Sequence, residues 1–285
     1  MAERPLVIAA SPSAISRVLS GASHSVAHLD PGLRRALATR VAGVAPARSL
    51  GFIRLDGYVI TKVLNGSALR TDGPFHWTPR ATRRIIGGPA AQLVLSGVSP
   101  EPLSAVRGEI SRLLNQAESR QELRSGSLAR WLYEAPESLR VAVTAEALTY
   151  ASEVIASVDL GLLDGTIDPS VNDPQWAVPG APWISLRGRR DLDVVSALVP
   201  GQRSILALRT GTLGLWAARD LGIVALSAAL CRPDQPLPAR IVGLWGASGR
   251  ALVLPVTPAI IKQAAREVLS CVEALNHRIS RAEAA

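Results

Sequence analysis

A nearly all-apolar run between residues 214 and 231 constrains the fold of this chain more than any other feature. It reads as a helix, and a helix without a polar face has to be buried on all sides. The runs WISLRGRRDLDVVSAL and SILALRTG precede it, and ARIVGLWG and RALVLPV follow it, all four with strand character. The order of helices, two adjacent strands, a buried helix, two strands and a final helix predicts an α/β core with a mixed central sheet flanked by helices.

Helix start signals appear at three places along the chain. Ser11-Pro12, Thr78-Pro79 and Thr257-Pro258 each pair a capping residue with a proline suited to the first helical position, and each precedes an apolar stripe. The run LGFIRLDGYVITKVL reads as a β-hairpin that turns at Asp56-Gly57. Residues 165–182 read as a polar, proline-rich connector.

These patterns predict two parts. Residues 1–80 are expected to form an accessory lobe of helices and a hairpin, and residues 81–285 to form the α/β core.

The composition favours a globular protein with an anionic partner. Hydrophobic residues make up 48% of the 285 residues and the formal net charge is +8, with Lys62 and Lys262 as the only lysines. Cys231 and Cys271 are expected in the core rather than in a disulfide or metal site. We expect a soluble, cytoplasmic protein without a membrane partner, because no signal peptide is visible and the longest apolar run is too short to span a bilayer.

Charged side chains line one face of the first strand-like run. Because side chains alternate across a strand, Ser185, Arg187, Arg189, Asp191 and Asp193 are expected on one face and apolar residues on the other. Ala207 and Arg209 share a face of the next strand by the same rule. No Walker loop and no nucleophile elbow is present, so neither nucleotide-triphosphate nor serine-hydrolase chemistry is indicated.

The order GRRD at 188–191, LALRTG at 206–211 and RDLGIVALSAAL at 219–230 resembles the RecB-like branch of the PD-(D/E)XK nuclease superfamily. That family carries Gly-x-x-Asp on one strand, Asp-x-Lys-Thr-Gly on the next, and then a helix with a Gln-x-x-x-Tyr pattern. The resemblance implies a restriction-endonuclease-like core in which two carboxylates hold a divalent metal and a lysine orients the attacking water. It covers mainly 183–256 and, more weakly, 81–95.

The chain departs from the family pattern at most chemical positions. Asp191 is retained, but the second carboxylate falls at Ala207 and the lysine at Arg209. Asp193 is the remaining acid that could join Asp191 as a metal ligand. Mg²⁺ takes one or two protein carboxylates in an octahedral oxygen shell, and Arg209 would bring a permanent positive charge into its place. The resemblance therefore implies a vestigial active site at Asp191, Ala207 and Arg209.

Two further family positions differ as well. The upstream Gly-x-x-x-His pattern falls on Gly88 to Gln92, so the histidine is missing. The Gln-x-x-x-Tyr position is taken by Arg219 or Asp220 followed by apolar residues.

Three functions remain compatible with the sequence. The first is a catalytically inactive module that binds DNA through Arg187, Arg189 and Arg209, as a DNA-binding or structural subunit of a repair, recombination or antiphage-defence complex. Such a module needs no cofactor, and the resemblance implies a helicase, translocase or nuclease as its protein partner. The second is an active Mg²⁺-dependent deoxyribonuclease whose missing carboxylate has migrated, for example to Glu134, Glu137 or Glu146 on a preceding helix. The third is a protein–protein scaffold that does not touch nucleic acid.

The first function also predicts how Asp191 is accommodated without a metal. Arg209 should project from the neighbouring strand on the same face and pair with Asp191 or Asp193.

Overall fold

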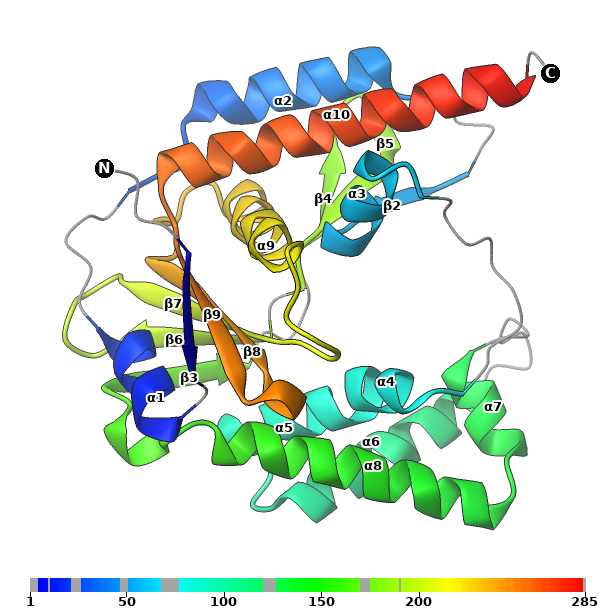
Figure 1. Cartoon of the computed structure of the whole chain (residues 1–285), viewed down its shortest axis with the longest axis vertical. Coiled ribbons are helices and arrows are strands. Elements are labelled where there is room, and N and C mark those ends of the chain that lie inside the picture. The colour runs from blue at the N-terminus through cyan, green and yellow to red at the C-terminus, as the bar shows by residue number, and fades with distance from the viewer. Residues whose placement is uncertain are drawn as a thin grey trace.

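A six-stranded mixed sheet lies at the centre of the protein in the computed structural model (Figure 1). The structure describes residues 5–9, 11–21, 27–46, 51–67, 77–119, 127–169, 175–189 and 191–283. The strand order is β1-β9-β8-β7-β6-β3, and β7 and β8 are the one parallel pair among the described strands of this sheet. The strands of this sheet are β1 (Leu6–Ala9), β3 (Gly165–Pro169), β6 (Leu192–Ser196), β7 (Arg203–Leu208), β8 (Arg240–Trp245) and β9 (Arg250–Pro255).

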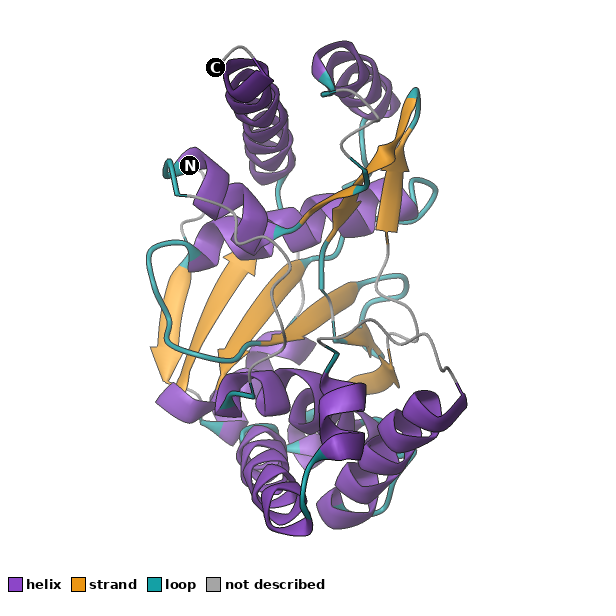
Figure 2. Cartoon of the chain, turned by 90° about the vertical axis from the view of Figure 1, so that its right-hand side faces the viewer, coloured by secondary structure: helices purple, strands orange, loops and turns teal. Residues whose placement is uncertain are grey.

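Helices cover both faces of this sheet (Figure 2). The longer helices are α1 (Pro12–Ser20), α2 (Pro31–Val44), α3 (Gly57–Leu64), α5 (Gly88–Leu95), α6 (Pro102–Ser119), α7 (Leu128–Glu134), α8 (Glu137–Ala156), α9 (Ala217–Cys231) and α10 (Pro258–Glu283). The shorter ones are α4 (Pro79–Thr82), the π-helical segment η2 (Arg83–Gly87), and the 3₁₀ turns η3 (Leu160–Leu162) and η4 (Gly246–Ser248). The expected mixed sheet flanked by helices is confirmed.

The core is divided by the sheet into two apolar clusters. Strand β7 is buried along its whole length, with Ile205 and Ala207 in one cluster and Leu206 and Leu208 in the other. The first cluster lies between the sheet, α9 and α10, and the second between the sheet and the helices α1 and α5–α8. The apolar run found in the sequence is α9, which is buried because it contacts the sheet on one side and α10 on the other.

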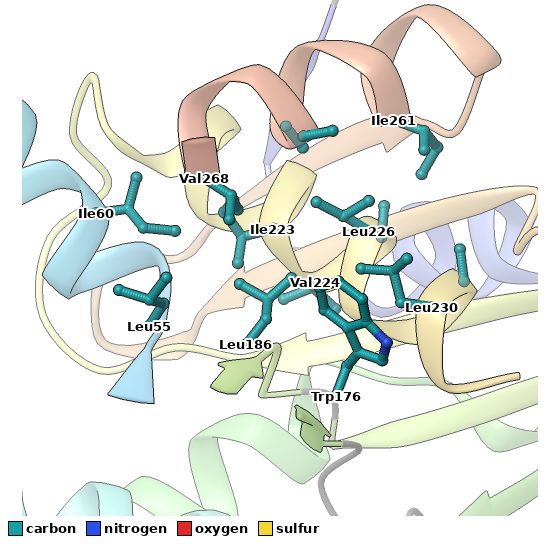
Figure 3. Packing of buried hydrophobic residues seen from close by; sticks show 14 of the residues in the cluster. Leu55, Ile60, Trp176, Leu186, Ile223, Val224, Leu226, Leu230, Ile261 and Val268 are labelled. Carbon is teal, nitrogen blue, oxygen red and sulfur yellow. The ribbon is translucent and has the colours of Figure 1, made fainter. Parts of the chain in front are cut away.

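A second, three-stranded sheet packs beside α9 (Figure 3). Its order is β2-β5-β4, formed by β2 (Ile53–Leu55), β5 (Ala181–Arg187) and β4 (Gln175–Val178). Trp176 and Leu186 of this sheet belong to the first apolar cluster, together with Val224 of α9. The central helix is thereby held between two sheets.

The predicted connector at 165–182 is wrong in its described part. Strands β3 and β4 lie within it, and residues 170–174 fall outside the described residues. Proline and polar residues suggested a loop, but β3 is an edge strand, where a terminal Pro169 is tolerated because the outer edge needs no donor.

The predicted hairpin at Asp56-Gly57 is also wrong. Asp56 is the N-cap of α3, and its Oδ1 accepts a hydrogen bond from the backbone N–H of Val59 at 2.8 Å. Aspartate suits both a turn and an N-cap. The helix forms because Ile60 and Val63 are spaced to bury one face against α9 and α10.

The described segments of the first eighty residues pair with strands and pack on helices from the rest of the chain. Strand β1 pairs antiparallel with β9 at one edge of the six-stranded sheet, and β2 pairs parallel with β5. Helices α2 and α3 pack on α10. The segment expected to be an accessory lobe thus contributes a strand to each sheet.

The charged strand expected over 183–194 is interrupted. Residues up to Arg187 belong to β5 in the small sheet, whereas residues from Leu192 belong to β6 in the large sheet. The chain crosses between the two sheets at Gly188–Asp191, and Arg190 lies outside the described residues. This crossing places the end of β5 and the start of β6 at one end of β7, where the candidate site lies.

One helical stretch among the described residues, Glu137–Leu162, is long and apolar enough to cross a membrane, with mean hydropathy 1.3. Its helix α8 packs on α5 and α6.

Candidate nucleic-acid cleft

A cleft of about 640 Å³ opens at the end of β7. One wall comes from the N-terminal ends of α3 and α9, and the opposite wall from the α4–α5 segment and α6. In Figure 1 these elements lie above and below the right-hand side of the sheet. The floor is formed by the ends of β5 and β7 and by the crossing between the sheets.

The two walls differ in chemistry. The first, which we call the aromatic wall, carries Tyr58 and Trp216. The second, which we call the basic wall, carries Arg80, Arg84 and Arg112. A ligand in this cleft would therefore meet aromatic rings on one side and guanidinium groups on the other.

Asp191 is the central group of the floor, and none of its surface is exposed. Its Oδ1 accepts hydrogen bonds from Gln92 Nε2 at 2.6 Å and from Arg189 Nε at 3.0 Å. Its Oδ2 accepts from the backbone N–H of Leu208 at 2.7 Å and from Arg209 Nη1 at 3.4 Å. A buried carboxylate is costly unless it is paired and hydrogen-bonded, and both conditions are met here.

Arg209 joins Asp191 to a second carboxylate. Its Nε donates to Asp220 Oδ2 at 2.6 Å, and Asp220 lies in the first turn of α9, where a helix favours negative charge. The remaining donors of Arg209 reach the carbonyl oxygens of Leu208 at 3.2 Å and Arg189 at 2.9 Å. Burial lowers the pKa of the Arg209 guanidinium, but Asp220 and Asp191 raise it more, so the net shift is upward and the group stays charged.

The predicted pair between Arg209 and Asp191 is therefore present, but it is not the shorter contact of Arg209. Two carboxylates, Asp191 and Asp220, hold one guanidinium between them. With Arg189 on the other side of Asp191, the four charges cancel. These four side chains at the centre of the floor carry no net charge, with no ion added.

Local packing fixes this arrangement. A Cβ on Gly188 would lie 2.6 Å from the Cα of Val224 and 2.8 Å from the Cβ of Ser227, so only glycine allows the crossing to approach α9 this closely. On the other side, the hydroxyl of Tyr150 on α8 donates to the carbonyl oxygen of Arg209 at 3.2 Å. Burial and the nearby Asp191 raise the pKa of Tyr150, which keeps the phenol protonated as a donor.

The mouth of the cleft carries crowded positive charge. Desolvation by neighbouring atoms lowers the pKa of Arg84, and the charges of Arg189, Arg187 and Arg80 lower it further, while Asp56 acts in the opposite direction. Such crowding means that an anion entering between these arginines would relieve their mutual repulsion.

The position of the family's second carboxylate lies away from the cleft. Ala207 is fully buried in the apolar cluster that contains α9, and it is paired with Gly243 of β8. Asp193 also turns elsewhere, because its Oδ2 lies 3.5 Å from Arg203 Nη1 and 3.9 Å from Arg232 Nη1. In the part of the chain that the structure describes, no three His, Cys, Asp or Glu side chains gather as metal ligands.

The three proposed migrated carboxylates do not line the cleft. Glu146 is paired with Arg83, and Glu134 is paired with Arg130 on the surface of α7. Glu137 lies in the first turn of α8. The acid that does reach the floor from another element is Asp220.

Of the arginines expected to bind DNA, Arg187 and Arg189 line the cleft. Arg209 lines it as well, but only 8% of its surface is exposed and its donors already have partners. Sequence reasoning missed Arg80 and Arg84, which come from a helix far away in the chain. Gln92, where the family pattern has a histidine, donates a hydrogen bond to Asp191, a contact that was not predicted from the sequence.

No protein-family model, no curated protein and no solved structure matches this chain.

Proposed function

We propose that this protein is a catalytically inactive RecB-like nuclease-fold protein that binds DNA in the cleft between the aromatic and basic walls. It acts as a DNA-binding or structural subunit of a cytoplasmic repair, recombination or antiphage-defence complex, beside a helicase, translocase or nuclease. The observation that carries the proposal is the floor, where the guanidinium of Arg209 stands between Asp191 and Asp220. A metal ion would have to displace a buried, hydrogen-bonded cation from this position.

DNA binding is supported by the arginines around that neutral floor. Arg80 and Arg84 are exposed, and the structure shows no ion pair for either within the described residues. Guanidinium groups match phosphate oxygens in shape and charge. Arg187, at the end of β5, adds a further positive charge to the lining of the cleft.

The binding test compares two double variants with equal loss of charge. In Arg80→Ala/Arg84→Ala the basic wall is removed, whereas in Arg40→Ala/Arg266→Ala two exposed arginines of the outer helices α2 and α10 are removed. Affinity for a fluorescent DNA oligonucleotide is measured across a salt series. We expect the first variant to bind more weakly and to reduce the salt slope by about 1.5. The control should keep most of the affinity.

Equal effects of the two variants would place DNA binding outside the cleft and overturn the proposed site, and no binding by the wild type even at low salt would favour the scaffold function. A cleavage assay with Mg²⁺ and with Mn²⁺ addresses the nuclease alternative. We expect intact DNA, because two of the three described acids that line the cleft, Asp191 and Asp220, are engaged by Arg209, and the third, Asp56, caps the start of α3. Metal-dependent cleavage that disappears in Asp191→Asn would overturn the proposal of inactivity.

A further inference from the structure

The cleft has two walls of different chemistry, and this difference bears on the form of the nucleic acid. Tyr58 projects from the first turn of α3 on the aromatic wall, and 54% of its surface is exposed. The Nζ atom of Lys62, one turn along the same helix, lies 5.7 Å from the centre of its ring. The opposite wall presents Arg80 and Arg84.

A DNA duplex does not match a cleft with one aromatic and one basic wall. Its bases are stacked on one another, and only their edges face the grooves, while phosphates run along both strands on the outside. An aromatic ring on the cleft wall would then meet backbone or base edges. A single strand exposes the flat face of each base on one side and its phosphates on the other.

The size of the cleft also suits a single strand of nucleic acid. A volume of about 640 Å³ is in the range of pockets that enclose a ligand of nucleotide size. The walls are helices held by neighbouring elements: α3 packs on α9 and α10 on one side, and α4 and α5 pack on α8 on the other, so the space is bounded along both sides.

We propose that the cleft binds single-stranded DNA, with a base stacked on Tyr58 and the adjoining phosphates held by Arg80 and Arg84. This inference rests on the proposed function and specifies the form of DNA that the cleft takes. Lys62 lies over one face of the Tyr58 ring from the same helix, so the base would stack on the other face. From the floor, Arg189 donates a hydrogen bond to the backbone carbonyl oxygen of Arg84 at 3.1 Å.

The test uses three ligands of matched length: a single-stranded oligonucleotide, the same backbone without bases, and a blunt duplex. The proteins are the wild type, Tyr58→Ala, Tyr58→Phe and the control Tyr133→Ala, which removes a tyrosine that is 48% exposed on α7 and does not line the cleft. The wild type should bind the single strand more tightly than the other two ligands.

Tyr58→Ala should weaken binding of the single strand about tenfold, as loss of one base–aromatic stack does. It should leave binding of the base-free backbone unchanged. Tyr58→Phe and Tyr133→Ala should stay close to the wild type. Ultraviolet cross-linking of a halogenated-base oligonucleotide gives a second readout, and the cross-linked peptide should contain Tyr58.

The inference is overturned if the duplex binds as tightly as the single strand, or if Tyr58→Ala behaves like Tyr133→Ala. In that case the proposed function still stands, provided that Arg80→Ala/Arg84→Ala weakens duplex binding. If none of the three ligands binds, the proposed function itself fails. Melting curves of all variants show that the exposed substitutions leave the fold intact.

Discussion

Replacing Arg209 with alanine tests the central ion cluster most directly. The side chain is 8% exposed, and it binds Asp220, Asp191 and the carbonyl oxygens of Leu208 and Arg189. Removal of the Arg209 side chain takes away the ion-pair partner of Asp220. We therefore expect a large loss of stability from a single truncation.

The magnitude follows from the two carboxylates. The contact with Asp220, at 2.6 Å, is a charge-assisted hydrogen bond of the kind that contributes about 1.5–3 kcal/mol. The contact with Asp191 is longer, at 3.4 Å, and Asp191 keeps three other donors when Arg209 is lost. Breaking a fully buried pair costs about 3–5 kcal/mol. Since the Asp220 side chain is 15% exposed and water reaches it in part, we expect about 3 kcal/mol, mostly from Asp220.

Double-mutant cycles separate the two contacts. Free energies of unfolding are measured by denaturant titration with tryptophan fluorescence for Arg209→Ala, Asp220→Asn, Asp191→Asn and the two double variants. The coupling energy should be about 2 kcal/mol for Arg209 with Asp220 and below about 1 kcal/mol for Arg209 with Asp191. The exposed pair Arg130–Glu134 is the control, with an expected coupling of about 0.3–0.5 kcal/mol.

The opposite order of the two couplings would show that Asp191 is the true partner of Arg209. If Arg209→Ala costs no more than Arg130→Ala, the reasoning about a buried cation between two carboxylates is wrong.

Two further predictions concern packing and pH. Gly188→Ala should lower the melting temperature strongly, because a Cβ there would meet the backbone of Val224, whereas Gly108→Ala in the open middle of α6 should be neutral or slightly stabilising; equal melting temperatures would contradict the close approach. Burial raises the pKa of the Cys271 thiol to about 12, while an unfolded thiol titrates near pH 8.5. The folded state thus keeps the proton longer, and this stability is present below about pH 8.5 and is lost as the pH rises toward 12. Between pH 8 and 10 the wild type should lose about 2 kcal/mol more than Cys271→Ala, measured as unfolding free energies; parallel pH dependence of the two proteins would rule this out.

Local signals in the sequence predicted the helix starts correctly. The side chains of Ser11, Thr78 and Thr257 each accept a hydrogen bond from the backbone of the first helical turn, as the capping pattern requires. These interactions join residues three positions apart, so the sequence alone contains them. The apolar run of α9 was equally clear, because burial on all sides leaves no polar face.

The errors have a common cause in long-range pairing. The stretch around Asp56 suits a turn or a helix start, and only the packing of α3 on α9 and α10 decides between them. The crossing from the small sheet to the large sheet at Gly188 is likewise not predicted by alternating side chains. Alternation indicates which residues share a face of a strand but not which strands are neighbours.

The candidate site was predictable to the same extent. The pair between Asp191 and Arg209 follows from adjacent strands, and it was expected. The sequence shows Asp220 only as a departure from the family pattern. Its ion pair with Arg209 is not predicted, because the distance between the two side chains depends on how α9 lies over the sheet. Arg80 and Arg84 carry no signal of their own, since nothing in their sequence shows that their helix forms a wall of the cleft.

The neutral floor also predicts how divalent ions affect DNA binding. In a metal-dependent nuclease site the ion bridges carboxylates and phosphate, so it strengthens DNA binding. Here Asp191 and Asp220 are already occupied by Arg189 and Arg209, and an added Mg²⁺ ion would meet two guanidinium groups. Mg²⁺ should then act only as a competing counterion on the phosphates.

We therefore expect DNA affinity to fall when Mg²⁺ is added, and chelation by EDTA to have no effect on the purified protein. Asp220→Asn should show the same Mg²⁺ dependence of DNA affinity as the wild type, because the Asp220 carboxylate pairs with Arg209 and does not bind Mg²⁺. Titrations with Mg²⁺ at constant chloride concentration measure this. Tighter DNA binding on addition of Mg²⁺, lost in Asp220→Asn, would mean that Arg209 yields its place to a metal ion when DNA is bound.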